Sequence, residues 1–172
     1  MAQSAAEQRS RADKVLRRLA HALAVHGFRR TKPTYFVRRR GVLVEFLHVH
    51  KYSFGPKFRM HMGLRVVTSP KDSTALNGPA SDNWRPTGST GCGRHYELRF
   101  HRSDESVERC AQELAAFAVE VAEPWFQRWL DPVSLLRAES PLSVSEQLLL
   151  REALKAGATE ASAATVASLG AV

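Results

Sequence analysis

The sequence predicts an α+β fold with an N-terminal helix, an antiparallel sheet of about four strands, and C-terminal helices packed on one face of that sheet. Three features of the pattern support this prediction. Apolar residues recur at helical spacing before Gly27, alternate in steps of two in segments within residues 35–67 and 95–101, and return to helical spacing from Ser103 onward. A chain of 172 residues is long enough for one domain with its own core.

The first helix is predicted from about residue 5 to residue 26. Val15, Leu19 and Leu23 belong to one apolar stripe along it, and basic side chains lie on the opposite side. Gly27 is typical of the left-handed residue that follows the last turn of a helix.

Strands are predicted over residues 35–39, 42–50, 57–67 and 95–101. Arg40 and Gly41 form a compact turn between the first two of these strands. Along residues 57–67, apolar side chains alternate with basic ones such as Arg59 and Arg65. This alternation predicts a sheet with one face packed on the core and one basic face exposed to water.

The predicted domain comprises an α+β core over residues 1–140, with a long loop at residues 68–93, and a C-terminal helical hairpin over residues 141–172. The loop is rich in Gly, Pro, Ser and Thr and has neither a helical nor a strand period, which is typical of a binding loop, a lid or a disordered segment. Ser143 and Glu146 form a capping-box pattern at the start of the hairpin, and Gly157 separates its two helices. We expect the hairpin to pack on the same domain.

Charge is divided unevenly along the chain. Residues 1–102 contain 20 Lys and Arg against 6 Asp and Glu, whereas residues 103–172 contain 5 against 11. The sequence has no apolar signal core, no run of about 18 apolar residues, and only two cysteines, whose spacing matches no metal motif. We therefore expect a cytoplasmic protein that has a cationic surface, needs no cofactor and does not associate with a membrane.

The basic strand face is the predicted binding surface. We expect it to engage an acidic protein partner, as a non-enzymatic interaction module of the immunity or adaptor type would, with the aromatic side chain of Trp84 as an anchor. An equally open alternative is that the acidic C-terminal helices cover this face within the molecule. The predicted partner-binding residues are Arg38, Arg40, Arg59, Arg65, Trp84, Arg85 and Arg99.

Two other functions stay open at this stage. Nucleic acid is a common partner of a chain with a pI near 10.1, although no helix-turn-helix or zinc-finger pattern is present. A metal-dependent enzyme is the other alternative, because His48 and His50 share one strand face and His61 joins them only in one of the two registers of the following hairpin. No arrangement of residues predicts a catalytic nucleophile or a carboxylate pair.

The order of elements and two strand motifs resemble a family of bacterial domains of unknown function, the four-three-zero-four family. The resemblance covers about residues 14–130, with His50-Lys51 and His61 at positions where the family pattern has Gln-Lys and Asn, and with Gly63 matching. It implies a small α+β domain and brings no activity that can be transferred. The stretches that carry it are Gly27-Phe28, Tyr35–Arg38, Val42–Lys51 and Phe58–Leu64.

Overall fold

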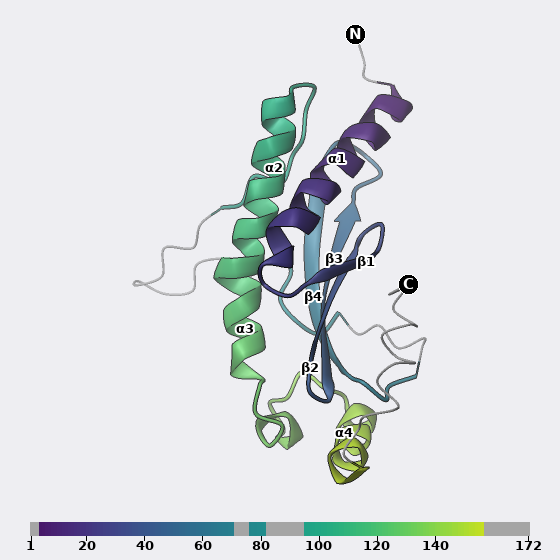
Figure 1. Cartoon of the computed structure of the whole chain (residues 1–172), viewed down its shortest axis with the longest axis vertical. Helices are drawn as coiled ribbons and strands as arrows, with labels where there is room; N and C mark the ends of the chain where they lie inside the picture. The colour runs from purple at the N-terminus through teal and green to yellow at the C-terminus, as the bar shows by residue number, and fades with distance from the viewer. Residues whose placement is uncertain (1–3, 71–75, 82–94, 157–172) are drawn as a thin grey trace.

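The computed structural model describes residues 4–70, 76–81 and 95–156 and confirms the predicted α+β fold. A four-stranded antiparallel sheet packs against helices α1 and α2, which lie side by side, and α3 continues the line of α2 (Figure 1). Helix α4 lies at one end of the molecule, apart from the other helices, and contacts β4 (Figure 1). No helix in the described part of the chain is long and apolar enough to cross a lipid bilayer.

Helix α1 (Ala5–Ala24) is defined at both ends by the signals that the sequence contains. Ser4 and Glu7 form a reciprocal capping box at its start. Val15, Leu19 and Leu23 are buried, as the apolar stripe predicts. Gly27 follows the helix with φ 81°, a conformation that favours glycine, and a side-chain carbon added there would lie 3.3 Å from Arg38 Cδ, so that the Arg38 side chain would have to shift slightly.

The sheet has the order β1-β2-β3-β4, with β1 (Arg29–Lys32), β2 (Tyr35–Arg40), β3 (Leu43–Lys51) and β4 (Phe58–Val66). The last three correspond to predicted strands. Strand β1 was not predicted, because its four residues, Arg-Arg-Thr-Lys, contain no apolar side chain and therefore no alternation. It pairs with β2 and forms one edge of the sheet.

The strand predicted at residues 95–101 is wrong as a ladder, although its alternation is correct. Tyr96, Leu98 and Phe100 are buried, but the segment forms only an isolated bridge between Lys57 and Arg99. Within the predicted loop, residues 77–81 bond along the same side of β4, where the amides of Gly78 and Ser81 donate to β4 carbonyl groups. Two short irregular segments thus cover this edge of the sheet.

The helices after residue 102 are interrupted rather than continuous. Helix α2 (Asp104–Phe117) begins at the Ser103 cap and passes through a π-helical turn (Ala118–Ala122) into α3 (Glu123–Arg128). Pro124, which has no amide hydrogen to donate, follows this turn, and we attribute the change of helical period to it. A short 3₁₀ turn (Ser134–Leu136) precedes α4 (Val144–Ala156), which begins at the predicted Ser143–Glu146 pair. Its predicted partner helix lies outside the described residues.

Candidate functional site

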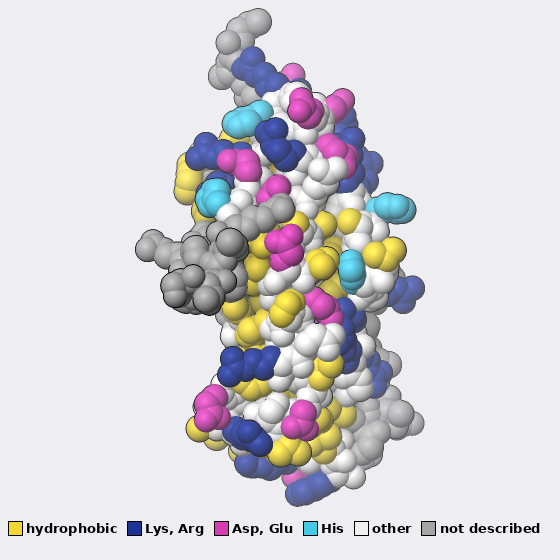
Figure 2. Space-filling view, turned by 90° about the vertical axis from the view of Figure 1, so that its left-hand side faces the viewer, with side chains coloured by type: hydrophobic (Ala, Val, Ile, Leu, Met, Phe, Trp, Pro, Cys, Tyr) yellow, Lys and Arg dark blue, Asp and Glu magenta, His cyan; other side chains and the backbone are white. Residues whose placement is uncertain are grey.

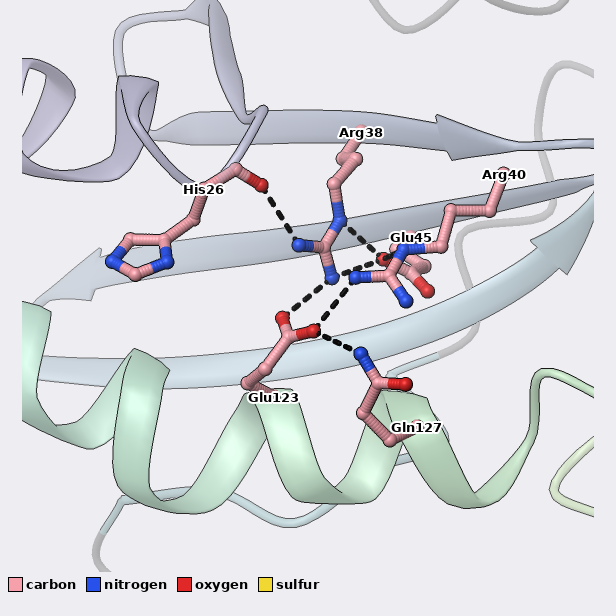
Figure 3. A network of polar contacts seen from close by, with 6 residues as sticks. All are labelled: His26, Arg38, Arg40, Glu45, Glu123 and Gln127. Atoms are coloured by element: carbon pink, nitrogen blue, oxygen red, sulfur yellow. Dashed lines mark hydrogen bonds and ion pairs between the residues drawn. The ribbon is translucent and has the colours of Figure 1, made fainter.

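Two predicted binding residues, Arg38 and Arg40, lie between the sheet and α3 instead of in solvent (Figure 3). The guanidinium of Arg38 donates to Glu45 Oε2 at 2.6 Å, to Glu123 Oε2 at 2.7 Å and to the carbonyl oxygen of His26 at 2.8 Å. Arg40 donates to Glu123 Oε1 at 2.6 Å. Two carboxylates of the chain already occupy these arginines, so the structure gives the prediction that they face a partner no support.

The two carboxylates in this network respond differently to their surroundings. Glu45 is completely buried, and burial raises its pKa more than the neighbouring arginines lower it. Glu123 is less buried; burial alone would raise its pKa, but hydrogen bonds from three side chains, Arg38 and Gln127 foremost, hold it below the ordinary value of 4.5. The hydrogen bonds from the arginines and Gln127 thus favour the charged form of Glu123 more strongly than that of Glu45.

Arg65, which alternation places on the outer face of the sheet, is also buried. Its exposed fraction is 0%, because α4 and residues 69–70 cover the end of the face where it lies. Of the other predicted residues, Arg59 is half-buried on the outer face and Arg99 is exposed beside the start of β4. Trp84 and Arg85 lie outside the described residues. The predicted surface is thus divided between two faces and an edge of the sheet.

Ion pairs connect the basic first part of the chain with the acidic second part, so some of the opposite charges neutralise each other within the molecule. Arg18 on α1 pairs with Glu108 on α2 at 3.1 Å, and Lys14 pairs with Asp104 at 3.5 Å. On the side of the molecule seen in Figure 2, basic and acidic side chains are interspersed, with hydrophobic side chains between them. The alternative that acidic helices cover basic residues is therefore supported for α1 and for the helix-facing side of the sheet.

The register of the β3–β4 hairpin answers the question that the sequence left open about the three histidines. His48 lies directly opposite His61, so that both imidazoles and that of His50 share the outer face. The ring centroid of His48 lies 6.1 Å from that of His61 and 6.3 Å from that of His50. Among the described residues, however, no group of three His, Cys, Asp or Glu side chains is placed to hold a metal ion.

Aromatic and basic side chains surround these histidines on the same face. Tyr35 lies opposite His48 with its ring stacked at 4.3 Å, and Lys32 of β1 lies 5.8 Å above the Tyr35 ring. Arg59 lies opposite His50. We call this group of six the histidine patch: Lys32, Tyr35, His48, His50, Arg59 and His61.

No carboxylate of the strands lies on the face that carries the histidine patch. Glu45 is the only acidic residue in the four strands, and it points to the helices. The patch occupies the end of the face near the β3–β4 turn, since Val37, Val44 and Phe46 farther along the same face are buried. It therefore forms a compact cationic and aromatic area rather than a row along the whole sheet.

The environment of His48 follows from this composition. Its Nδ1 atom is buried and has no hydrogen-bond partner among the residues that the structure describes. Burial, followed by the positive charges of His61 and His50, lowers the pKa of His48 from 6.5 to about 4. His48 is therefore neutral at pH 7.

Two residues of the histidine patch can be assigned to it only when neighbouring strands are considered together. Tyr35 begins a predicted strand and belongs to the same face as His48 once the two strands are paired in register. Lys32 falls in the unpredicted strand β1. Neither residue is recognised as part of a surface until the pairing of neighbouring strands is known.

Comparisons of the chain with protein-family models, with curated proteins and with solved structures found no match. The resemblance to the four-three-zero-four family stays a prediction.

Proposed function

We propose that this protein is a non-catalytic binding module whose histidine patch binds single-stranded nucleic acid. The observation that carries the proposal is the combination of rings and cations, without a strand carboxylate, on one face of an antiparallel sheet. Single strands are bound by aromatic side chains that stack on bases and by basic side chains that contact phosphates. A duplex keeps its bases stacked inside, so the rings of the patch favour a single strand.

The charges of the patch match this partner in sign and position. Lys32 lies at one side of the ring row Tyr35–His48–His61, and Arg59 lies nearer the hairpin. Each phosphate that they contact releases counterions, so two contacts predict a slope of log K against log salt of about −1.4 for a single strand. The acidic protein partner predicted from the sequence has less support, because Arg38, Arg40 and Arg65 are buried or paired within the molecule.

The test is fluorescence anisotropy with a labelled, mixed-sequence oligonucleotide of about 12 nucleotides. Lys32→Glu combined with Arg59→Glu should lower the affinity at least tenfold, because each substitution replaces attraction to a phosphate with repulsion. Arg109→Glu is the matched control, since Arg109 is exposed on α2 in the helical layer.

Three results would contradict the proposal: the folded wild-type protein fails to bind the oligonucleotide, the patch variant and Arg109→Glu lose the same affinity, or the wild type binds a duplex of the same sequence as tightly as the single strand. A fourth arm uses polyglutamate as competitor. If polyglutamate displaces the oligonucleotide as well as unlabelled oligonucleotide does, the surface recognises negative charge alone, and an acidic protein becomes the better candidate partner.

A further inference from the structure

Buried polar atoms without partners gather where the end of β4 meets residues 68–70 and α4. Arg65 Nη2 donates to the carbonyl oxygens of Ser69 at 2.7 Å and Pro70 at 2.6 Å. Its Nε and Nη1 atoms, Ser69 Oγ and Glu146 Oε1 are all buried with no hydrogen-bond partner in the described part of the chain. Folded proteins leave few such atoms unsatisfied, so a concentration of them indicates a site that a further molecule completes.

Glu146 is the member of this group that also lines a cavity. Its side chain comes from the first turn of α4 and is only 6% exposed. Its Oε2 atom accepts a hydrogen bond from the amide of Ser143 at 3.3 Å, which is the capping contact of the helix. The capping role therefore uses one carboxylate oxygen, and Oε1 is the oxygen left to accept another hydrogen bond.

A cavity of about 560 Å³ lies against Glu146. This volume is within the range of about 300–1,000 Å³ that is typical of small-molecule sites. Most of its surface is apolar and comes from Leu148 and Leu149 of α4 and from Pro70 and Pro141. Apolar walls with few polar groups, Glu146 among them, favour a ligand that is mainly hydrophobic and carries one polar group.

The position of Arg65 near Glu146 disfavours a positively charged ligand. Burial lowers the pKa of Arg65, while the negative charge of Glu146 acts in the opposite direction and favours the charged guanidinium. Glu146 therefore already has a cation beside it. A second cation in this partly enclosed place would lie close to Arg65 and be repelled, whereas a neutral donor would not.

We propose that the cavity beside α4 binds a small, uncharged, largely apolar molecule that donates one hydrogen bond to Glu146 Oε1. Alcohols, phenols and indoles belong to this class. The site is independent of the proposed nucleic-acid function, because it shares no residue with the histidine patch.

The experiment is isothermal titration calorimetry on the full chain with two naphthalene probes of similar shape. 2-Naphthol has a hydroxyl donor, and 2-methoxynaphthalene has none. We expect saturable binding of one 2-naphthol and an affinity for 2-methoxynaphthalene that is at least about tenfold weaker, which is the loss typical of a hydrogen bond to a charged acceptor.

A pair of Leu→Trp variants on α4 locates the binding. Leu148→Trp adds a large side chain to the wall of the cavity and should abolish 2-naphthol binding, whereas Leu154→Trp lies on the same helix outside the cavity wall and should leave it unchanged. Both leucines are substantially exposed, at 53% and 42%, so neither substitution disturbs the core. Circular dichroism checks that each variant is folded.

Each contrary result overturns a named part of the proposal. Equal affinity for the two probes removes the hydrogen bond to Glu146. Absence of binding to the folded wild-type protein means that the cavity holds water only. Unchanged binding in Leu148→Trp places the naphthol elsewhere on the molecule.

Discussion

The two faces of the sheet carry similar basic residues but differ in the acids available to them. On the helix-facing side, Arg38 and Arg40 are paired with Glu45 and Glu123. At the patch end of the outer face, basic side chains lie among imidazoles with no strand carboxylate beside them. Whether an arginine in a strand joins a network with helix carboxylates thus depends on which helix packs over it, and the strand sequence alone does not give this.

The largest effect should come from breaking the network on the helix-facing side. Glu123→Ala leaves the buried guanidinium of Arg38 with less compensating charge, and we expect a loss of about 3 kcal/mol in the free energy of unfolding. Urea denaturation measures it. Glu108→Ala is the control, since Glu108 of α2 also pairs with an arginine, Arg18 of α1, but is about half exposed. Its loss should stay below about 1 kcal/mol. Equal losses would contradict the difference in burial on which this comparison depends.

On the outer face, stacking and charge can be separated by single substitutions. Tyr35→Ala should weaken oligonucleotide binding by about 1–3 kcal/mol while leaving the salt dependence unchanged, because it removes a ring and no charge. Lys32→Gln should instead reduce the slope of log K against log salt by about 0.7. Anisotropy titrations at several salt concentrations measure both. If Tyr35→Ala alters the slope as much as Lys32→Gln does, the ring and the charge do not act separately.

The pH dependence of stability tests the histidine patch without any partner. The pKa of His48 is about 4 in the folded protein and about 6.5 in the unfolded chain, so the unfolded chain takes up a proton first as the pH falls. Stability should therefore decrease between pH 6.5 and pH 4.

We expect the contribution of His48 to this loss to be about 1 kcal/mol between pH 7 and pH 5, after allowance for solvent screening at a partly exposed side chain. Denaturant unfolding of His48→Gln at the two pH values should show a smaller difference than the wild type. His21→Gln, on the exposed side of α1, should retain the wild-type difference. If His48→Gln loses as much stability between pH 7 and pH 5 as the wild type does, the pH dependence belongs to other groups.

The smallest effect is expected at the exposed contact between α1 and α2. Lys14 and Asp104 are 3.5 Å apart, and their side chains are 47% and 77% exposed. Asp104→Asn should change the free energy of unfolding by less than about 0.5 kcal/mol, and high salt should abolish even that difference. A loss comparable with that of Glu123→Ala would show that surface pairs contribute as much as the buried network.

Local patterns predicted the elements whose signals are complete within a few residues. Helix α1, strands β2 to β4 and the Ser143–Glu146 cap each depend on neighbours in sequence, and each was found. Strand β1 was not predicted, because a short polar edge strand has no alternation of apolar and polar residues.

The candidate site was harder to predict because it depends on contacts between distant segments. Alternation correctly places Arg65 on the outer face, but it does not reveal that α4, about 80 residues later, covers that end of the face. The convergence of His61 with His48 and His50 likewise depends on the register of β3 and β4, because a shift of one residue would turn His61 to the opposite face. The face of the sheet to which a side chain points can be predicted from neighbouring residues in the strand. The element that covers that side chain cannot, because it comes from a distant part of the chain.

The edges of the sheet bear on how the protein behaves at high concentration. An unpaired strand offers its amides and carbonyls to other copies of the same chain and can template aggregation. Here one border consists of four residues rich in positive charge, and the opposite border is bonded to residues 77–81 and 98–100. Both borders thus oppose strand addition, one by electrostatic repulsion and one by prior occupation, so this sheet is a poor seed for fibrils.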